Sequence, residues 1–315
     1  MKCLNWMDYK EITEFTQTLD NFDVLILGNC SGLDERSSYL ESLFSENHKN
    51  IIRFKVYYDE EDDSNLNILL DGSQINVKES SALAEKLINQ KILIDMTCFD
   101  VQDLTYLLYM LCKEQLPFSV SYVEPKEYKK KDGINATSLS SSGDHLLSDE
   151  GNGINYLPPF IPLPGKDSSI YVLSLGFEPY RLAGFMSSDE IDVKSEKSYL
   201  LGLPAFDIGW ERKTINANYK HIKSDTPNIQ IVPADDPIQT YIKIKEIYQS
   251  LTQNSQQINL LPIGTKPQTL GMIWFALDQK LVERKNNIGL MYDFVKKIPN
   301  RTIEIRNIHV WKFIH

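Results

Sequence analysis

Short apolar segments that alternate with segments of helical length are the feature of this sequence that most limits its fold. In the first part of the chain the apolar segments are Asp23–Gly28, Ile51–Tyr58, Ile92–Met96 and Phe118–Val123. The segments of helical length between them are Asp34–Phe44, Ser80–Asn89 and Val101–Cys112. Apolar strands separated by helices are typical of a mainly parallel sheet that helices cover on both faces.

The same alternation begins again after residue 165. The second set of predicted strands comprises Ile170–Leu175, Tyr199–Leu203, Ile229–Val232, Ile258–Leu261 and Ile288–Tyr292. The predicted helices are Tyr180–Ser187, Pro237–Thr252 and Gln268–Glu283. The alternating residues of Thr302–Ile314 predict one or two edge strands of this second half. We therefore expect an α/β protein with two Rossmann-like, mainly parallel-sheet halves, residues 1–125 and 166–315.

The ends and the middle of the chain give further expectations. Residues Asp8–Leu19 are predicted to form a short amphipathic helix. Residues 126–165 are poor in apolar side chains and rich in Ser, Gly and Asp, which predicts a loop or linker. Within it, Tyr156–Pro164 contains four prolines and is expected to be extended.

The two halves share an order of features that suggests an internal repeat. Gly32–Arg36 and Gly176–Arg181 each follow the first strand of a half and read as glycine, apolar residue, acid and arginine. Ile92–Leu111 aligns with Ile258–Leu277 without a gap. This order predicts a duplication. The alternative is that all Rossmann-like units look alike at this level of comparison.

The charge of the chain limits its partners. The 315 residues carry a net charge of −10, which disfavours broad, nonspecific nucleic-acid binding but allows a local basic pocket. Met1–Asn21 lacks a signal-peptide pattern, and no segment reaches the ~18 apolar residues of a membrane span. The four cysteines contain no CxxC pair, which argues against structural zinc. We expect a cytoplasmic protein that does not associate with a membrane.

The most suggestive candidate site is the loop Gly264-Thr265-Lys266-Pro267, between a predicted strand and a predicted helix. Glycine allows a phosphate to approach the backbone, threonine offers a hydroxyl, and lysine supplies a positive charge. Proline suits the first turn of the helix. The loop is not a Walker A motif, because GxxxxGK[ST] is absent. The alternative is a helix cap with a solvated lysine.

Two arginines and a tryptophan are further candidate ligand-binding residues. Arg36 and Arg181 occupy equivalent places in the two halves and could each contact an anion. Each could instead form a structural pair with the neighbouring Glu35 or Glu178. Trp210 could stack on a nucleotide base, or it could pack within a compact loop.

Three aspartates at predicted strand ends give an alternative chemistry. Asp95 ends a predicted buried strand and is a further candidate ligand-binding residue at the same cleft, or it could cap a helix. Together with Asp235 and Asp236 it could instead serve as an acid/base group or bind magnesium, and Asp236 could simply cap a helix. The five histidines show no metal-ligand spacing, and GxSxG, HExxH and GxGxxG are all absent. We therefore predict no cofactor and no metal site, and the sequence identifies no catalytic residue.

The Gly264–Pro267 loop is similar to the glycine-threonine-lysine loop of CRISPR-associated Rossmann fold (CARF) sensor domains. The resemblance implies that loops at the carboxyl edge of the sheet bind cyclic oligoadenylate. The first strand-to-helix loop of the family also lines the pocket, and it corresponds here to Asn29–Ser31. Family sensors usually precede an effector domain, often a nuclease, whereas here a second Rossmann-like unit follows. Two repeated halves could then mimic the family's dimer within one chain.

These observations predict a nucleotide-binding or nucleotide-sensing component of a prokaryotic antiviral defence system. Its ligand would be a nucleotide or another phosphorylated small molecule, and a partner protein would supply the effector. One alternative is a magnesium-dependent enzyme acting on a nucleotide or phosphorylated sugar through the three aspartates. Another is a scaffold subunit of a multiprotein complex, with Tyr156–Pro164 as its interface.

Overall fold

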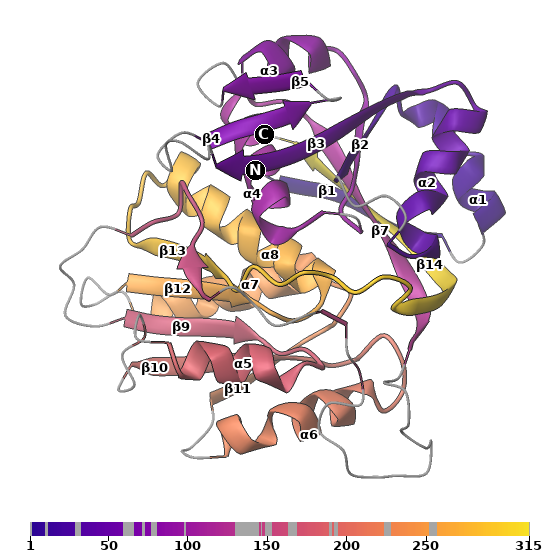
Figure 1. Ribbon diagram of the computed structural model, residues 1–315. Helices are drawn as coiled ribbons and strands as arrows, with labels where there is room; N and C mark the ends of the chain where they lie inside the picture. The colour runs from indigo at the N-terminus through magenta and orange to yellow at the C-terminus, as the bar shows by residue number, and fades with distance from the viewer. Residues whose placement is uncertain are drawn as a thin grey trace. The chain divides into compact units, whose positions relative to one another are not determined.

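The chain folds into two compact α/β units, shown in the computed structural model of Figure 1. Unit 1 comprises Met1–Tyr128 together with Pro299–His315, and unit 2 comprises Lys129–Ile298. The structure describes residues 2–9, 12–28, 33–58, 66–70, 73–76, 81–97, 99–129, 145, 147–148, 153–162, 169–188, 191, 195–223, 228–251 and 257–314. Within these residues, no helix combines the length and the apolar character that crossing a membrane requires.

Unit 1 is built on an eight-stranded mixed sheet of order β1-β14-β7-β6-β2-β3-β4-β5. Its strands are β1 (Lys2–Tyr9), β2 (Val24–Gly28), β3 (Asn50–Tyr58), β4 (Leu66–Leu70), β5 (Ser73–Asn76), β6 (Ile92–Asp95), β7 (Phe118–Tyr128) and β14 (Thr302–Ile314). Its helices are α1 (Ile12–Thr16), α2 (Glu35–Glu46), α3 (Ser81–Leu87) and α4 (Val101–Lys113), with a 3-10 turn at Leu19–Asn21.

Four parallel strands form the centre of this sheet. β2 pairs in parallel with both β3 and β6, and β6 pairs in parallel with β7. All five residues of β2 are buried, as its unbroken apolar sequence predicts. An apolar cluster that includes Phe15, Leu25, Leu40 and Phe44 packs α1 and α2 against the sheet.

The last strand of the chain belongs to the first unit. β14 lies between β7 and β1 and is antiparallel to both. The sequence predicted Thr302–Ile314 as edge strands of the second half; in the structure it is an inner strand of the sheet in unit 1. Its pairing partners lie far away in the sequence, so its alternating pattern identified a strand but not the sheet to which it belongs.

The beginning of the chain also differs from the prediction. Lys2–Tyr9 is strand β1, whereas the helix predicted from Asp8 to Leu19 is reduced to α1 and the 3-10 turn. β1 pairs only with β14. The strand therefore depends on a neighbour that no local pattern reveals, which is why tertiary context overrides the helical periodicity.

Unit 2 is built on a six-stranded sheet of order β11-β10-β9-β12-β13-β8. Its strands are β8 (Asn155–Tyr156), β9 (Ser169–Ser174), β10 (Glu196–Gly202), β11 (Asn228–Val232), β12 (Gln257–Pro262) and β13 (Ile288–Tyr292). Its helices are α5 (Pro179–Met186), α6 (Trp210–Ile222), α7 (Pro237–Leu251) and α8 (Lys266–Leu277), followed by a π-helical turn at Asp278–Val282.

Helices of unit 2 pack in two pairs. α5 contacts α6, and α7 contacts α8. Because parallel βαβ connections are right-handed, the connections from β9 to β11 and those from β11 to β13 place their helices on opposite faces of the sheet. Figure 1 shows β12, β9 and β10 side by side, with α5 in front of β10. The coarse prediction of a mixed α/β chain with parallel strand pairs is confirmed.

The predicted linker, residues 126–165, falls mostly within unit 2. Its described part includes β8, which pairs antiparallel with β13. The Leu157 amide donates to the Leu290 carbonyl oxygen (2.7 Å), and the Leu157 and Phe160 side chains are buried. Within Tyr156–Pro164, the part up to Pro162 is thus packed onto the sheet of unit 2; residues 163 and 164 lie outside the described residues.

Candidate functional site

Four loops of unit 2 meet at one edge of its sheet. Strands β9, β10, β11 and β12 are mutually parallel, so the loops at their carboxyl ends lie at the same edge. These loops are residues 175–178, 203–209, 233–236 and 263–265, and each leads into the first turn of a helix. The sequence placed its main candidate site in the last of them.

Gly264 brings the loop after β12 against the end of β9. Its amide donates to Ser174 Oγ (2.9 Å). A Cβ atom at this position would lie 2.6 Å from Gln268 Oε1 and 2.8 Å from Ser174 Cβ. Only glycine fits this close approach, so the residue is required by packing between loops, whether or not a ligand also approaches it.

Thr265 caps α8 and ties it to the loop after β11. Its hydroxyl accepts from the Gln268 amide (3.4 Å) and donates to the Ala234 carbonyl oxygen (2.5 Å). The Gln268 side chain returns a hydrogen bond, because its Oε1 accepts from the Thr265 amide (3.3 Å). The two residues form a capping box, which fixes where the helix begins.

Lys266 is the first residue of α8, and its side chain is half-buried. The positive end of the helix dipole and the lysine charge coincide at this point. The amides of Gly264, Thr265 and Gln268 all donate to protein atoms. These three amides are therefore engaged within the protein, and the positive potential at this point comes from the helix dipole and the Lys266 charge.

Gln268 is a residue of this edge that sequence reasoning missed. Its side chain is fully buried, and its Nε2 has no hydrogen-bond partner among the described residues. Nε2 lies 3.5 Å from the place that a Cβ would occupy on Gly202, at the end of β10. The spacing Thr265-x-x-Gln268 is a capping-box signature and could have drawn attention to this glutamine.

Arg181 lies at the same edge, in the first turn of α5. Its Nε and Nη2 each donate to one carboxylate oxygen of Asp293 at 2.6 Å, and Glu178 lies 3.9 Å away. The guanidinium also lies over the Tyr292 ring. Burial would lower the pKa of Arg181, but Asp293 outweighs this effect and raises it. The structure therefore engages this arginine in a buried ion pair.

Arg36 holds the equivalent position in unit 1, near the start of α2. Its guanidinium donates to Asp34 Oδ2 (3.0 Å), the Val123 carbonyl oxygen (3.1 Å) and Thr302 Oγ1 (3.2 Å). Burial would lower the pKa of Arg36, yet the neighbouring Tyr122, Tyr128 and Asp34 raise it. The arginine joins α2 to strand β7 and to the start of β14.

Trp210 is the first residue of α6, and its side chain is buried. Its ring meets Phe177 edge to face, with 5.4 Å between the centroids, and Lys213 Nζ lies 5.6 Å from its centroid. The sequence analysis offered a compact loop around Trp210 as one alternative, whereas in the structure Trp210 begins a 13-residue helix. The buried indole packs at the loop edge of unit 2.

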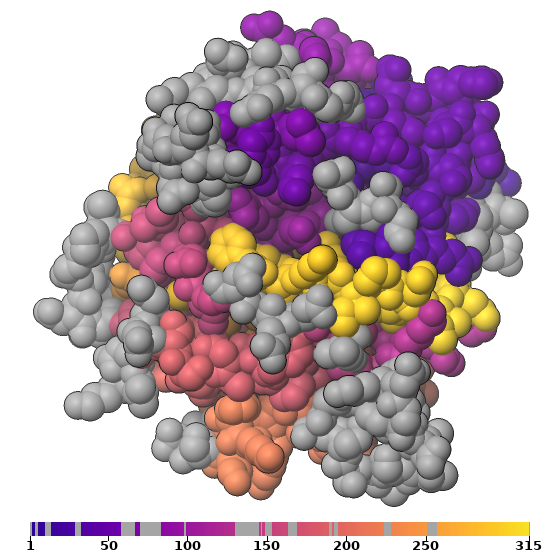
Figure 2. Space-filling model, in the orientation of Figure 1, coloured from indigo at the N-terminus to yellow at the C-terminus, as the bar shows by residue number. Residues whose placement is uncertain are grey.

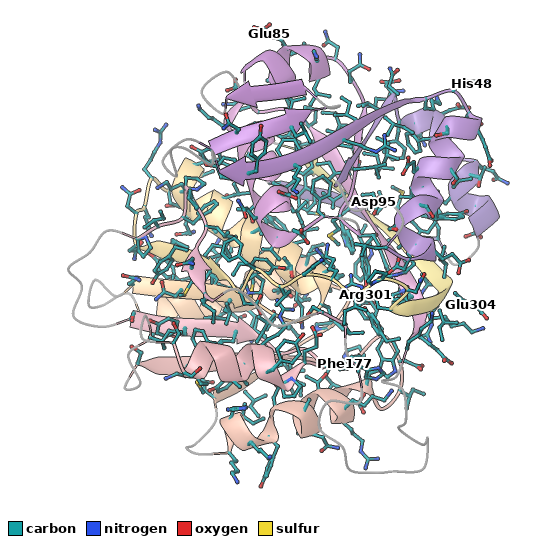
Figure 3. The ribbon with its side chains drawn as sticks, viewed as in Figure 1. His48, Glu85, Asp95, Phe177, Arg301 and Glu304 are labelled. Carbon is teal, nitrogen blue, oxygen red and sulfur yellow. The ribbon has the colours of Figure 1, made fainter. Side chains whose placement is uncertain are left out.

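Asp95, labelled in Figure 3, ends β6 in unit 1 and is fully buried. Its Oδ1 accepts from the Thr97 amide (3.0 Å), while Oδ2 makes no hydrogen bond to the residues that the structure describes. Burial raises the pKa of Asp95 to about 6, against the opposing hydrogen bonds from Thr97. Glu85 and Glu304, which are labelled in the same figure, are exposed, in contrast to the buried Asp95.

The aspartates of the magnesium hypothesis are distributed over two units. Asp236 Oδ1 accepts from the amides of Ile238 (2.8 Å) and Gln239 (3.0 Å), so it caps α7. Asp235 precedes it in unit 2, whereas Asp95 belongs to unit 1. Across the described ranges, no group of three His, Cys, Asp or Glu residues is arranged to hold a metal ion.

The structure thus separates the predicted residues into two sets. Gly264, Thr265, Lys266, Arg181 and Trp210 lie at the loop edge of unit 2, whereas Arg36 and Asp95 lie in unit 1. Asn29–Ser31, the loop that corresponds to the first pocket loop of CARF domains, lies outside the described residues. No known family model matches the chain, and no curated protein matches it either.

Proposed function

We propose that the protein is a nucleotide-binding or nucleotide-sensing component that holds a phosphate group of its ligand at the loop edge of unit 2. The observation that carries this proposal is the position of Lys266, which begins α8 at the point where the loop after β12 is joined to the end of β9 and to the loop after β11. Ser174 Oγ and the Ala234 carbonyl oxygen make those joining hydrogen bonds.

Electrostatics favour a small anion at this position. A helix N-terminus carries a partial positive charge, and a lysine in the first turn adds a full one. The net charge of the chain is −10, so a long polyanion is repelled while a local positive site remains available to a small ligand. This combination fits a nucleotide or another phosphorylated small molecule.

The arginines have a supporting role in this proposal. The N–H groups of Arg181 and Arg36 already donate to carboxylates and carbonyl or hydroxyl oxygens. Arg181 positions the loop after β9 by anchoring α5 to Asp293, directly after β13. In this proposal Lys266 contacts the phosphate from the first turn of α8, while the buried Trp210 supports the loops from within.

We further propose that the units are two Rossmann-like halves derived by duplication. The strand order β7-β6-β2-β3 of unit 1 matches β13-β12-β9-β10 of unit 2, with α2 and α5 after β2 and β9 and with α4 and α8 after β6 and β12. In both units an arginine from the helix after β2 or β9 reaches toward the strand beside β6 or β12: Arg36 contacts Val123 on β7, and Arg181 contacts Asp293 directly after β13.

The resemblance of Gly264–Pro267 to CARF sensor loops supports a place in a prokaryotic antiviral defence system. In that setting the chain acts as the sensor, and a partner protein supplies the effector. The buried packing of Leu157 and Phe160 on unit 2 weighs against Tyr156–Pro162 as a scaffold interface.

A thermal-shift panel on the full chain tests the proposal. Mono-, di- and triphosphate nucleosides, cyclic dinucleotides and linear and cyclic oligoadenylates are added to the wild type. A ligand at 100 times its Kd stabilises the folded state by about 2.7 kcal/mol.

Lys266→Ala should weaken the affinity for that ligand about 10- to 100-fold, because a charge-assisted hydrogen bond is lost. The exposed Lys220, on α6, provides the control Lys220→Ala. If no compound stabilises the wild type at millimolar concentration, the proposal is wrong.

A further inference from the structure

The Gln268 side chain combines a satisfied acceptor with an unsatisfied donor. Oε1 accepts from the Thr265 amide at 3.3 Å, while the buried Nε2 has no partner among the described residues. Exchanging the two atoms would place an NH₂ group against the Thr265 N–H, two donors facing each other. The capping box therefore fixes the orientation of the amide, with Oε1 on the Thr265 amide and Nε2 on the side of Gly202.

The surroundings of Nε2 suggest where its partner would come from. The donor lies beside Gly202, and Gly202 and Gly264 are both partly exposed. Neither glycine carries a side chain that could satisfy the donor or cover it. Buried polar groups are nearly always hydrogen-bonded, so an unpaired N–H at a candidate site indicates an acceptor that arrives from outside.

The chemistry of that acceptor follows from its neighbours. Lys266 and the N-terminus of α8 provide positive potential within two residues of Gln268, which favours an oxygen carrying negative charge. A neutral amide donates without adding further charge, so it fixes the position of an oxygen that the lysine attracts. A phosphoryl oxygen satisfies both conditions.

We infer that Gln268 is a ligand-contacting specificity residue, whose Nε2 donates to a phosphoryl oxygen of the ligand while its Oε1 keeps the helix capped. This inference rests on the proposed function, because it assigns a second protein group to the same phosphate. The ligand reaches Nε2 past Gly202, next to the loop 203–209. Ile208 at the far end of that loop is 99% exposed, so its side chain does not hold the loop closed.

The decisive variant is Gln268→Glu. Glutamate is a standard partner of threonine in a capping box, so a purely structural role predicts that this variant folds normally. A ligand-contacting role predicts a different result, because the donor is replaced by an acceptor that repels phosphate. Gln268→Met is the second variant; it removes the donor without adding charge and serves if the glutamate variant does not fold.

The matched control is Gln279→Glu. Gln279 lies on the same continuous helical run, in the π-helical turn after α8, and is also buried. It is 11 residues beyond Gln268, which at a rise of ~1.5 Å per residue is about 16 Å away. The control adds the same charge to the same unit without touching the loop edge.

Calorimetric titration with ATP and with inorganic pyrophosphate, together with the thermal shift of each variant, provides the readout. We expect both Gln268 variants to bind at least about 10-fold more weakly than wild type, as loss of a hydrogen bond to a charged group predicts, and Gln279→Glu to bind like wild type. Wild-type affinity in folded Gln268→Met or Gln268→Glu would overturn the inference while leaving the proposed function intact. If neither probe nor any nucleotide of the panel binds the wild type, both fail together.

Discussion

The two units carry opposite charges at the strand-to-helix junctions that follow β6 and β12. In unit 1 the strand β6 ends in the buried Asp95, and Asp100 precedes α4. In unit 2 the strand β12 is followed by an uncharged glycine and threonine, and Lys266 begins α8. In the gapless alignment, Asp100 stands opposite Lys266. A shared strand order therefore does not imply a shared ligand, and our proposal places the anion at the loop edge of unit 2.

The largest effects are expected from replacing the buried arginines, Arg181 in unit 2 and Arg36 in unit 1, and comparing the two losses of stability tests how far the units correspond. Arg181→Met removes both hydrogen bonds to Asp293, which is 5% exposed, and leaves that carboxylate buried without its cation. We expect a loss of about 3–5 kcal/mol in the free energy of unfolding, and a similar loss for Arg36→Met. Urea denaturation followed by tryptophan fluorescence measures both.

A surface arginine supplies the control for this comparison. Arg306 lies 3.7 Å from Glu124, and its side chain is 29% exposed, so Arg306→Met should cost less than about 1 kcal/mol. Equal losses in the free energy of unfolding for Arg306→Met and Arg181→Met would show that burial does not increase the contribution of the ion pair to stability.

Alkaline pH should lower the stability of unit 1 and leave the stability of unit 2 unchanged. His309 on β14 is buried between Asp8 on β1 (Nδ1 to Oδ1, 2.5 Å) and Glu124 on β7 (Nε2 to Oε2, 2.8 Å). Burial alone would lower the pKa of His309, but its hydrogen bonds to the two carboxylates raise it to about 9. The folded state therefore holds this proton more tightly than the unfolded state. The associated stability, about 3 kcal/mol, is complete below pH ~6.5 and is lost as the pH rises through ~9.

Hydrogen–deuterium exchange between pH 6 and 10, corrected for the intrinsic exchange rate, locates this effect. Protection should fall in β1, β14 and β7, while β9 and β12 keep theirs. His309→Gln should be less stable than wild type at pH 6 and insensitive to pH in this window. A uniform loss of protection over both units would contradict the assignment to His309.

Replacing Asp95 should raise the stability of the protein, whereas replacing His309 should lower it. Its pKa is raised to about 6 from 3.8, so its charged form destabilises the folded state. Stability from this group is present below pH ~3.8 and is lost as the pH rises through ~6. Asp95→Asn should therefore stabilise the protein at pH 8 by about 2 kcal/mol, since the full difference in pKa corresponds to about 3 kcal/mol and the new NH₂ group also lacks a partner. Thermal unfolding at pH 4 and pH 8 measures this gain, which should vanish at the lower pH.

The smallest expected effect concerns the cap of α8. Thr265→Ala removes the hydroxyl that accepts from Gln268 and donates to Ala234. The loss should be about 1–2 kcal/mol by urea denaturation, and Thr265→Ser, which keeps the hydroxyl, should lose much less. A threonine whose removal costs nothing would show that the loops are joined by other contacts.

Local patterns predicted the parallel cores of both units. The apolar runs at Ile92 and Ile258 lie in β6 and β12, because strands buried on both faces need unbroken apolar sequence. The sequence failed where pairing is non-local. β1 exists only beside β14, and β14 lies between strands that are remote in sequence. The sequence analysis did not predict helix α6, because Pro204 and Phe206, just before its start at Trp210, are typical of a loop.

Sequence reasoning was less informative about the candidate site. It identified Gly264–Lys266 because strand-to-helix loops have a fixed place in parallel sheets. It left open whether Arg36 and Arg181 bind anions or form structural pairs, since the deciding partners are remote in sequence: Val123 lies on β7, and Asp293 directly follows β13. The unpaired donor of Gln268 depends on side-chain orientation, which no pattern of residue types encodes.

The position of β14 has a consequence for how the chain matures. Figure 2 shows atoms of the yellow C-terminal segment at the surface, yet β14 is an inner strand, and its Thr302 lies opposite Tyr128, the last residue of β7. The polypeptide thus departs from unit 1 and returns to it at paired residues, after unit 2 has been made. During synthesis on the ribosome, unit 2 can complete its sheet before β14 has been made. At that stage the sheet of unit 1 still lacks the strand between β7 and β1. Of the two units, the one whose synthesis starts earlier consequently completes its sheet later.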